Sequence, residues 1–338
     1  MREELQNTDL WTVVRGPVLW GRASRSRAGE LWHAMRRFSH EVGHWVRRAP
    51  VTFAKVEHLA ESIAALQTNG SGVDGTTDAQ APIFLLSTGW RTGSTLLQRI
   101  LVTDPHLFLW GEPLGEKTLV SRVTEMVNCS LSPPDLKWRT RPLPDNLTSS
   151  SLATSWIATL SPSGDDFRLA LRSLFDRWLG DPARRLGFGR WGLKEVRLGA
   201  AEASLLHWLY PNARFVILSR HPYDSCVSLS DANWHPLYYR DLRVDSAAGF
   251  ARYWNRVALS WSELPVGFPA FQIKYEDLIS GNFNFRKFES WLGIKIKEEV
   301  ALSVVVGHSS VRSQPSWYER WIIAQEAPSG MRSLGYSE

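Results

Sequence analysis

A loop rich in glycine and hydroxyl side chains lies between a short apolar run and a helical pattern. The apolar run covers residues 83–86, and the loop over 87–95 reads Ser-Thr-Gly-Trp-Arg-Thr-Gly-Ser-Thr. A helical pattern follows over 95–101. Backbone N–H groups of such a loop and of a helix N-terminus point to one spot, where the helix dipole favours a phosphate. This strand, loop and helix predict a phosphate-binding site, with a plain βα turn as the alternative.

Several residues of the loop suit an anion. Gly93 lets the backbone approach a phosphate closely, the hydroxyl groups of Ser94 and Thr95 donate hydrogen bonds, and Arg91 supplies a positive charge. Trp90 packs either on the adenine of a nucleotide or on the rest of the loop. The residues of this loop expected to contact the bound ligand are Thr88, Gly89, Trp90, Arg91, Thr92, Gly93, Ser94 and Thr95.

Arg220 and Ser228 form a second candidate anion site. Arg220 follows the apolar run 215–218, and Ser228 lies eight residues later on a helical stretch that begins after Pro222. An arginine fork and a serine hydroxyl together suit a phosphate monoester, whose oxygens accept several charge-assisted hydrogen bonds. We therefore expect both side chains to bind one phosphate. By itself, an Arg-His-Pro sequence after a strand is also typical of a surface turn.

The first loop is not the phosphate loop of an ATPase. The spacing GxxxxGK[ST] is absent, and no lysine precedes Ser94 and Thr95. The second apolar run ends in Ser219 and Arg220 instead of an aspartate that would hold Mg²⁺. The sequence therefore predicts no metal. A P-loop kinase-like phosphotransferase that uses ATP and Mg²⁺ is the alternative enzyme.

Together, the two segments resemble the sulfotransferases that use 3′-phosphoadenosine 5′-phosphosulfate (PAPS). The first reads LLSTGWRTGSTLLQRIL over 85–101, and the second reads FVILSRHPYDSCVSL over 215–229. In that family the first motif binds the 5′-phosphosulfate of the donor, and the Arg…Ser pair of the second binds its 3′-phosphate. The resemblance covers residues 82–320. It implies transfer of a sulfonate group to an acceptor hydroxyl or amine, with release of the desulfonated nucleotide PAP.

Three further features resemble the bacterial and carbohydrate-modifying members of the family. Arg91 stands where many cytosolic members have lysine, residues 110–113 read Trp-Gly-Glu-Pro, and residues 192–197 read Gly-Leu-Lys-Glu-Val-Arg. The Gly-rich, Lys-containing loop of the small-molecule enzymes is not found near the C-terminus. The resemblance therefore implies an acceptor such as a carbohydrate, a glycolipid or a small natural product, and it disfavours a steroid or a phenol.

The resemblance also implies catalytic roles for three residues. Glu112, in the Glu-Pro element, would take the proton of the acceptor, and Arg91 would neutralise the leaving 5′-phosphate. Lys194 would assist Arg91 or hold the sulfonate; alternatively, it forms a structural ion pair with Glu112 or Glu195. Glu112 itself has an alternative role as a helix-capping or loop carboxylate.

Two histidines are alternative bases. His221 lies beside the second anion motif, remote from the expected position of the sulfur. His308 and Arg312 belong to the segment 307–313, which we expect to form a late loop over the nucleotide. Arg312 is therefore counted among the residues that bind the donor.

The elements that position these residues alternate along the chain. Strands are predicted at 83–86, 215–218 and 271–273, and each precedes a loop or turn and a helical stretch. Such alternation indicates a mostly parallel sheet covered by helices. We therefore expect an α/β fold, a P-loop-like three-layer sandwich with a central mostly parallel sheet, for residues 82–338.

Residues 1–81 are predicted to form an N-terminal helical extension and a linker. Apolar positions at helical spacing over 30–66, with a break at Pro50, indicate two amphipathic helices. Residues 67–81 are small, polar and Gly-rich, which is typical of a linker or an exposed loop. The domain boundary is therefore placed after residue 81.

The net charge of +5 and the isoelectric point of about 9.3 indicate that the protein attracts anions. Arginines are concentrated over residues 22–48. This basic region is either a solvated face or a site of peripheral membrane or partner contact. A non-catalytic protein that binds nucleic acid or acidic lipid would explain the charge but neither motif, so nucleic acid is not an expected partner.

The cysteines and the start of the chain bear on its compartment. Cys129 and Cys226 give no disulfide framework and no metal-ligand spacing, which favours free thiols in a reducing compartment. The first residues are acidic and polar, and no run of about 18 apolar residues follows. The sequence therefore predicts a cytoplasmic protein.

Overall fold

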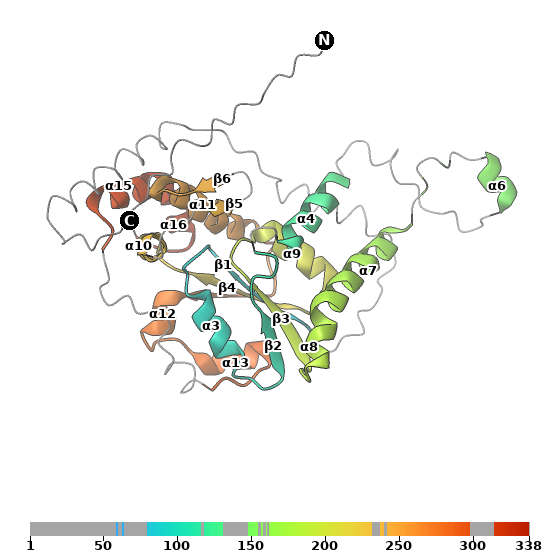
Figure 1. Cartoon of the computed structure of the whole chain (residues 1–338), viewed down its shortest axis with the longest axis horizontal. Helices are drawn as coiled ribbons and strands as arrows, with labels where there is room; N and C mark the ends of the chain where they lie inside the picture. The colour runs from blue at the N-terminus through green and yellow to red at the C-terminus, as the bar shows by residue number, and fades with distance from the viewer. Residues whose placement is uncertain are drawn as a thin grey trace, which may run out of the picture.

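The computed structural model describes most of the chain beyond residue 80 (Figure 1). The described residues are 59, 63, 80–115, 118–130, 148–154, 157, 160, 162–231, 237–239, 242–297 and 314–337. They form a five-stranded sheet with helices on both faces and a separate two-stranded hairpin.

All strand pairings in the five-stranded sheet are parallel, and the strand order is β2-β3-β1-β4-β7. The strands are β1 (Ile83–Ser87), β2 (Leu107–Trp110), β3 (Arg190–Glu195), β4 (Arg214–Ser219) and β7 (Ala270–Lys274). The hairpin pairs β5 (Leu237–Tyr239) with β6 (Leu242–Val244) in antiparallel fashion. Because the five strands are parallel, their carboxyl ends meet at one edge of the sheet.

Helices connect and cover the strands. Those before β4 are α3 (Ser94–Leu101), α4 (Leu119–Ser130), α6 (Ser149–Thr154), α7 (Gly164–Phe175), the π-helix η1 (Asp176–Gly180), α8 (Asp181–Arg185) and α9 (Ala200–Leu209). Those after β4 are α10 (Pro222–Asp231), α11 (Ala247–Ser260), the 3₁₀ turn η2 (Trp261–Glu263), α12 (Tyr275–Ile279), α13 (Phe285–Leu292), α15 (Trp317–Glu326) and α16 (Pro328–Ser333).

Two apolar clusters lie on opposite faces of the sheet. Along β1, Ile83 and Leu85 belong to one cluster with residues of α3, α12 and α13, whereas Phe84 and Leu86 belong to the other with residues of α9 and α11. This division follows from the two-residue period of a strand, which sends successive side chains to opposite faces. The arrangement confirms the predicted three-layer α/β sandwich.

The helices that follow β1 and β3 cover different faces of the sheet. The chain leaves β1 through α3 to reach β2, and it passes from β3 to β4 through α9, whose side chains belong to the opposite cluster (Figure 1). The strand order therefore reverses at β1. In open parallel sheets a crevice forms at such a point, beyond the carboxyl ends of the strands, and ligands bind there.

A few described residues belong to the predicted N-terminal extension. Leu59 and Ile63 are helical, and Leu59 is 1% exposed in the same apolar cluster as Phe84 and α9. The remainder of the two predicted amphipathic helices lies outside the described residues, so the boundary after residue 81 stays a prediction. None of the helices in the described part of the chain has the length and apolarity that crossing a bilayer requires.

Candidate functional site

The loop over 88–93 joins β1 to α3, as predicted, and depends on two glycines. Gly89 has φ = 142° and Gly93 has φ = 86°, both in the region that disfavours other residues. A Cβ atom on Gly89 would lie 2.7 Å from the ring of Tyr253, and one on Gly93 would clash with the ring of Tyr275. Both positions therefore require glycine, for backbone conformation and for space.

Hydrogen bonds hold the loop in a defined shape. The hydroxyl groups of Ser87 and Thr92 each donate to the carbonyl oxygen of Gly89 at 3.0 Å. The backbone N–H of Thr88 donates to the carbonyl oxygen of Leu218 in β4 at 3.0 Å. The hydroxyl of Thr88 is buried and has no partner among the described residues. The loop thus contains a buried hydroxyl with unused hydrogen-bonding capacity.

The first turn of α3 follows directly. Ser94 is buried and Thr95 is exposed in this turn. Gly93 occupies the N-cap position and has no side chain that could accept a hydrogen bond from the N–H groups of the turn. The first N–H groups of an α-helix have no partner within the helix. They are therefore available to an anion in front of the loop.

Arg91 connects the two predicted phosphate sites. Its Nε atom donates a hydrogen bond to the hydroxyl of Ser228 at 3.0 Å, and its carbonyl oxygen accepts one from Nη1 of Arg220 at 2.9 Å. Arg91 has φ = 64°, a conformation that costs a non-glycine residue about 1 kcal/mol. The bond from Arg220 helps to hold this conformation. Residues from both motifs thus lie in direct contact.

Arg220 itself is held by its surroundings just beyond β4. Its guanidinium carbon lies 4.5 Å from the centre of the Tyr275 ring, and its carbonyl oxygen accepts a hydrogen bond from the indole of Trp254 at 3.2 Å. Its Nε atom is buried without a partner among the described residues. A fixed guanidinium with an unused donor suits the phosphate monoester predicted for this position.

Trp90 packs against the protein in this structure. Its ring centroid lies 4.3 Å from that of Tyr253, whose hydroxyl donates to the carbonyl oxygen of Val196 at 2.7 Å. In this structure Trp90 therefore packs on Tyr253 of α11. A contact with adenine stays a prediction.

A second group of charged side chains lies at the carboxyl ends of β2 and β3. Glu112 accepts a short hydrogen bond from Nζ of Lys194 through Oε1, and its Oε2 lies 3.3 Å from Nη2 of Arg197. The side chain of Glu112 is 28% exposed, whereas those of Lys194 and Arg197 are 7% and 5% exposed. The ion pair between Lys194 and Glu112, which the sequence left as an alternative, is therefore present.

Glu195 lies behind this group and is 1% exposed. Its carboxylate binds Arg197 through two contacts, at 2.9 Å to Nε and 3.1 Å to Nη2. It also accepts hydrogen bonds from the backbone N–H groups of Val196 and Arg197. Burial raises the pKa of Glu195, and the hydrogen bond and charge of Arg197 act against this shift.

His221 is engaged with the C-terminal segment. Its backbone N–H donates to Glu276 at 2.8 Å, and its Nε2 lies 3.1 Å from the carbonyl oxygen of Ser337. The hydroxyl of Tyr336 donates to the same glutamate at 3.0 Å, and burial raises the pKa of that phenol, so it stays protonated as a donor. These contacts give His221 a structural role at the turn after Arg220.

The structure therefore forms two groups from the predicted residues. One group unites the loop with Arg220 and Ser228, and the other unites Glu112 with Lys194. His308 and Arg312 lie outside the described residues. The sequence did not point to the tyrosines that pack on the glycines of the loop, because they lie within elements far along the chain. Arg197 had a local signal, since it follows Lys194 by three residues at a strand end.

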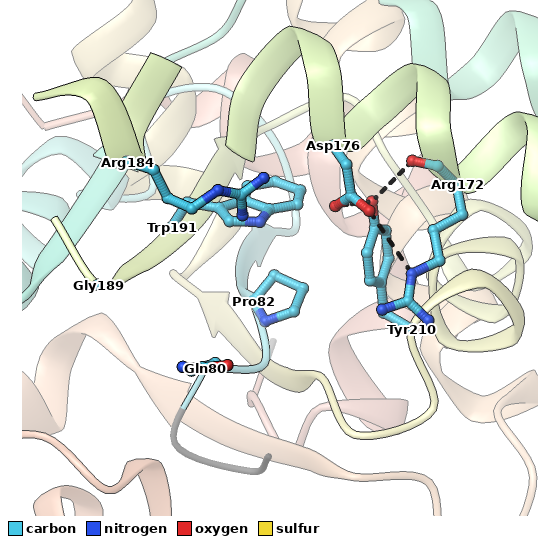
Figure 2. A pocket seen from close by; sticks show the side chains of 8 residues that line it. All are labelled: Gln80, Pro82, Arg172, Asp176, Arg184, Gly189, Trp191 and Tyr210. Atoms are coloured by element: carbon cyan, nitrogen blue, oxygen red, sulfur yellow. Dashed lines mark hydrogen bonds and ion pairs between the residues drawn. The ribbon is translucent and has the colours of Figure 1, made fainter. Parts of the chain in front are cut away.

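A cavity of about 240 Å³ lies elsewhere in the fold (Figure 2). Its lining includes Pro82 and Gly189, which immediately precede β1 and β3, so it lies at the amino edge of the sheet. Figure 2 shows Tyr210 facing Asp176 of the π-helix, and its hydroxyl donates to that carboxylate at 3.0 Å. The cavity is thus at the opposite edge from the phosphate loop and is not part of the candidate site.

Comparison with known proteins identifies the family. A family model described as the sulfotransferase family matches residues 82–297, which is more than half of the chain. The protein belongs to the sulfotransferase family. The match confirms the family that the two motifs suggested, and it spans the phosphate loop, Glu112, Lys194 and the second motif. No protein of curated function matches the sequence.

Solved sulfotransferase structures resemble the chain weakly. The sulfotransferase from Alicyclobacillus acidocaldarius is 15% identical, with coverage of 76% of this chain and 97% of that one and a TM-score of 0.39. The sulfotransferase domain of the Synechococcus PCC 7002 olefin synthase is 17% identical, with 80% and 100% coverage and a TM-score of 0.41. Mouse sulfotransferase SULT7A1, complexed with PAP, is 13% identical, with 72% and 66% coverage and a TM-score of 0.31. The family assignment rests on the sequence match, and it makes this protein a sulfotransferase enzyme.

Proposed function

We propose that this sulfotransferase takes the sulfonate group of PAPS and transfers it to a hydroxyl or an amine of a carbohydrate, a glycolipid or a small natural product, with release of PAP. The contact between Arg91 and Ser228 carries the proposal. A nucleotide with phosphates at both its 5′ and 3′ positions requires two anion sites close together. The loop after β1 and the residues Arg220 and Ser228 would supply these two sites, because Arg91 of the loop contacts both residues.

The described residues fit this donor. The 5′-phosphosulfate would bind the N–H groups of the loop and of the first turn of α3, with the hydroxyl of Thr88 nearby and Arg91 as the cation. The 3′-phosphate would bind the guanidinium of Arg220 and the hydroxyl of Ser228. Arg91, whose Nε atom donates to Ser228 in this structure, would then exchange this bond for one to the donor.

Transfer needs a base, cations and alignment. Glu112 would take the proton of the acceptor as the acceptor oxygen or nitrogen forms a bond to sulfur. Arg91 and Lys194 would stabilise the electron pair that stays on the 5′-phosphate of PAP when its bond to sulfur breaks. Side-chain cations and backbone donors can stabilise this charge, so the proposed step needs no metal. Lys194 contacts Glu112 in this structure, so it must turn from the base toward the donor.

Thermal-shift measurements with PAP and with ATP plus Mg²⁺ test the donor. A ligand that binds the folded state raises the melting temperature, so we expect PAP to stabilise the protein more than ATP with Mg²⁺ does. The variant Arg220→Ala should lose most of the PAP shift, whereas Arg99→Ala, an exposed arginine in the last turn of α3, should keep it. Stronger stabilisation by ATP with Mg²⁺ would point to a P-loop kinase-like phosphotransferase instead.

Mass spectrometry tests the reaction. The protein is incubated with PAPS and a panel of acceptors that includes a monosaccharide glycoside, a glycolipid, a phenol and an amine, and each product is examined for an added SO₃. Glu112→Gln should keep its affinity for PAP and lose turnover by at least about 100-fold, the usual contribution of a general base. Glu125→Gln, an exposed carboxylate on α4, is the matched control. Unchanged turnover in Glu112→Gln would place the base elsewhere.

A further inference from the structure

We infer that Arg197, held by the buried Glu195, is the residue that positions the Glu112 carboxylate for catalysis, and that Lys194 is the partner that leaves it. The inference rests on the proposed role of Glu112 as the base. Glu112 has a different cation at each oxygen, with Lys194 at Oε1 and Arg197 at Oε2. The two cations differ in how firmly they are held, and this difference assigns their roles.

Arg197 cannot move without breaking several contacts. Its Nε and Nη2 atoms bind the two oxygens of Glu195 at 2.9 and 3.1 Å, and its backbone N–H bonds the same carboxylate at 3.3 Å. The side chains of Arg197, Glu195 and Lys194 are all almost fully buried, at 5%, 1% and 7% exposed, so the two cations differ in their contacts and not in their burial. A planar guanidinium held at two points has a fixed orientation, so the Nη2 atom that also reaches Glu112 defines where the Oε2 oxygen lies.

Lys194 has no comparable anchor. Among the described residues, Glu112 is its one polar partner, and its charge sits on a flexible four-carbon stem. An incoming sulfonate and 5′-phosphate offer a second anion to the same ammonium group. Lys194 can therefore turn to the donor, while Arg197 stays on Glu112.

The different roles of Lys194 and Arg197 decide which oxygen of Glu112 acts as the base. When Lys194 leaves, Oε1 loses its hydrogen bond, and Oε2 keeps its contact with Arg197. Oε1 then accepts the proton of the acceptor in a geometry that Arg197 maintains. Donor binding would thus release the base at the moment when the sulfonate is in place.

The backbone beside Arg197 and the phosphate loop both contact Tyr253. Val196, between Glu195 and Arg197, accepts a hydrogen bond from the hydroxyl of Tyr253 at 2.7 Å. The ring of that tyrosine packs on Trp90 and leaves no room for a side chain at Gly89. The loop that would bind the donor and the arginine that orients the base therefore share one rigid support, which fixes their relative position.

The experiment compares Arg197→Lys with Arg252→Lys. Arg252 binds Glu326 through two contacts, at 3.1 and 3.4 Å, away from the site, so it controls for the general effect of replacing a paired arginine. PAP affinity is measured by thermal shift. PAPS cleavage is measured as PAP release, with the acceptor found in the panel and with water. Arg197→Lys should keep the PAP affinity and the KM for PAPS and lower kcat on the order of 100-fold, because lysine cannot bind both carboxylates in one plane.

A double variant tests the inference even if Arg197→Lys fails to fold. Arg197→Lys leaves a weakened partner for the buried Glu195, whereas Glu195→Gln/Arg197→Met removes both charges together and leaves neither unpaired. It should retain PAP binding and show a similar loss of kcat. A wild-type kcat in this double variant would overturn the inference.

A mutant cycle separates this inference from the proposed function. If Arg197 acts through Glu112, Arg197→Lys should lower the residual rate of Glu112→Gln by no more than about twofold, since two residues that act as a unit are not additive. An equal loss in both backgrounds would show that Arg197 acts independently and would overturn the inference. A fully active Glu112→Gln would instead contradict the proposed base, and no PAPS cleavage by the wild type would contradict the proposed donor.

Discussion

The Nε atom of Arg91 lies 3.0 Å from the hydroxyl oxygen of Ser228, although the two residues are 137 positions apart in the chain. One belongs to the loop after β1, and the other lies on α10 after β4. These strands are neighbours in the sheet, so their carboxyl ends bring the two motifs together. The contact joins the proposed sites for the two phosphates of the donor.

Replacement of Ser228 by alanine tests this contact. The variant removes a hydroxyl ligand of the 3′-phosphate, and a hydrogen bond to a charged group contributes enough to lower PAP affinity about 10-fold. We expect kcat at saturating PAPS to stay close to that of the wild type, because Arg91 remains available to the donor. Ser230→Ala, on the same helix with its hydroxyl bonded to the carbonyl of Cys226, is the control. An unchanged affinity for PAP in Ser228→Ala would remove this serine from the site.

Three glycine variants separate backbone conformation from space. Gly93→Ala adds a side chain at φ = 86° that clashes with Tyr275, and we expect it to abolish the PAP thermal shift and to lower the melting temperature. Gly115→Ala adds a side chain at φ = 52° in open space, so it should cost only the conformational strain of about 1 kcal/mol. Gly111→Ala has neither problem and should behave as the wild type. A PAP shift retained in Gly93→Ala would show that the loop does not hold the donor.

The burial of His207 predicts that the protein loses stability in mild acid. Burial lowers the pKa of His207 below its ordinary value of 6.5, so the unfolded chain binds a proton more readily than the folded one. The contribution of neutral His207 to the unfolding free energy is fully present above pH 6.5 and is lost as the pH falls through the lowered pKa. The slope is at most about 1.4 kcal/mol of unfolding free energy for each pH unit.

Denaturant unfolding at a series of pH values checks this expectation. His207 packs against the rings of Phe215 and Phe268, so His207→Phe keeps an aromatic ring there and should flatten the dependence below pH 6.5. The exposed His106→Gln is the control and should keep the slope of the wild type. Equal slopes in wild type and His207→Phe would contradict this origin.

Leu59 tests whether the N-terminal extension belongs to the folded core. It is 1% exposed in the cluster that also contains β1 and α9, and truncation of such a leucine costs about 3 kcal/mol of unfolding free energy. We expect Leu59→Ala to lower the stability by this amount and to leave PAP affinity unchanged. Leu169→Ala, at an exposed position on α7, should have little effect. An equally small effect in Leu59→Ala would support a separate extension that ends after residue 81.

The strand, loop and helix around 83–101 could be predicted because each signal is local. An apolar run, two glycines and a helical pattern follow one another along the chain, and β4 with α10 and β7 with α12 likewise follow an apolar run with a helical stretch. Local order also predicted a parallel sheet, since helices that alternate with strands leave the strands parallel. The two anion motifs and the family resemblance were therefore accessible from the sequence alone.

The strand order and the partners of each side chain required the tertiary structure. Glu112 and Lys194 are 82 residues apart, and they meet because β2 and β3 are neighbours at one edge of the sheet. The packing of Tyr253 and Tyr275 on the glycines of the loop, and the fixed orientation of Arg197 on Glu195, likewise depend on which helix covers which strand. Composition and spacing along a chain specify the kinds of chemical groups that are present, whereas the distances between those groups are decided by the packing of elements that are remote in sequence.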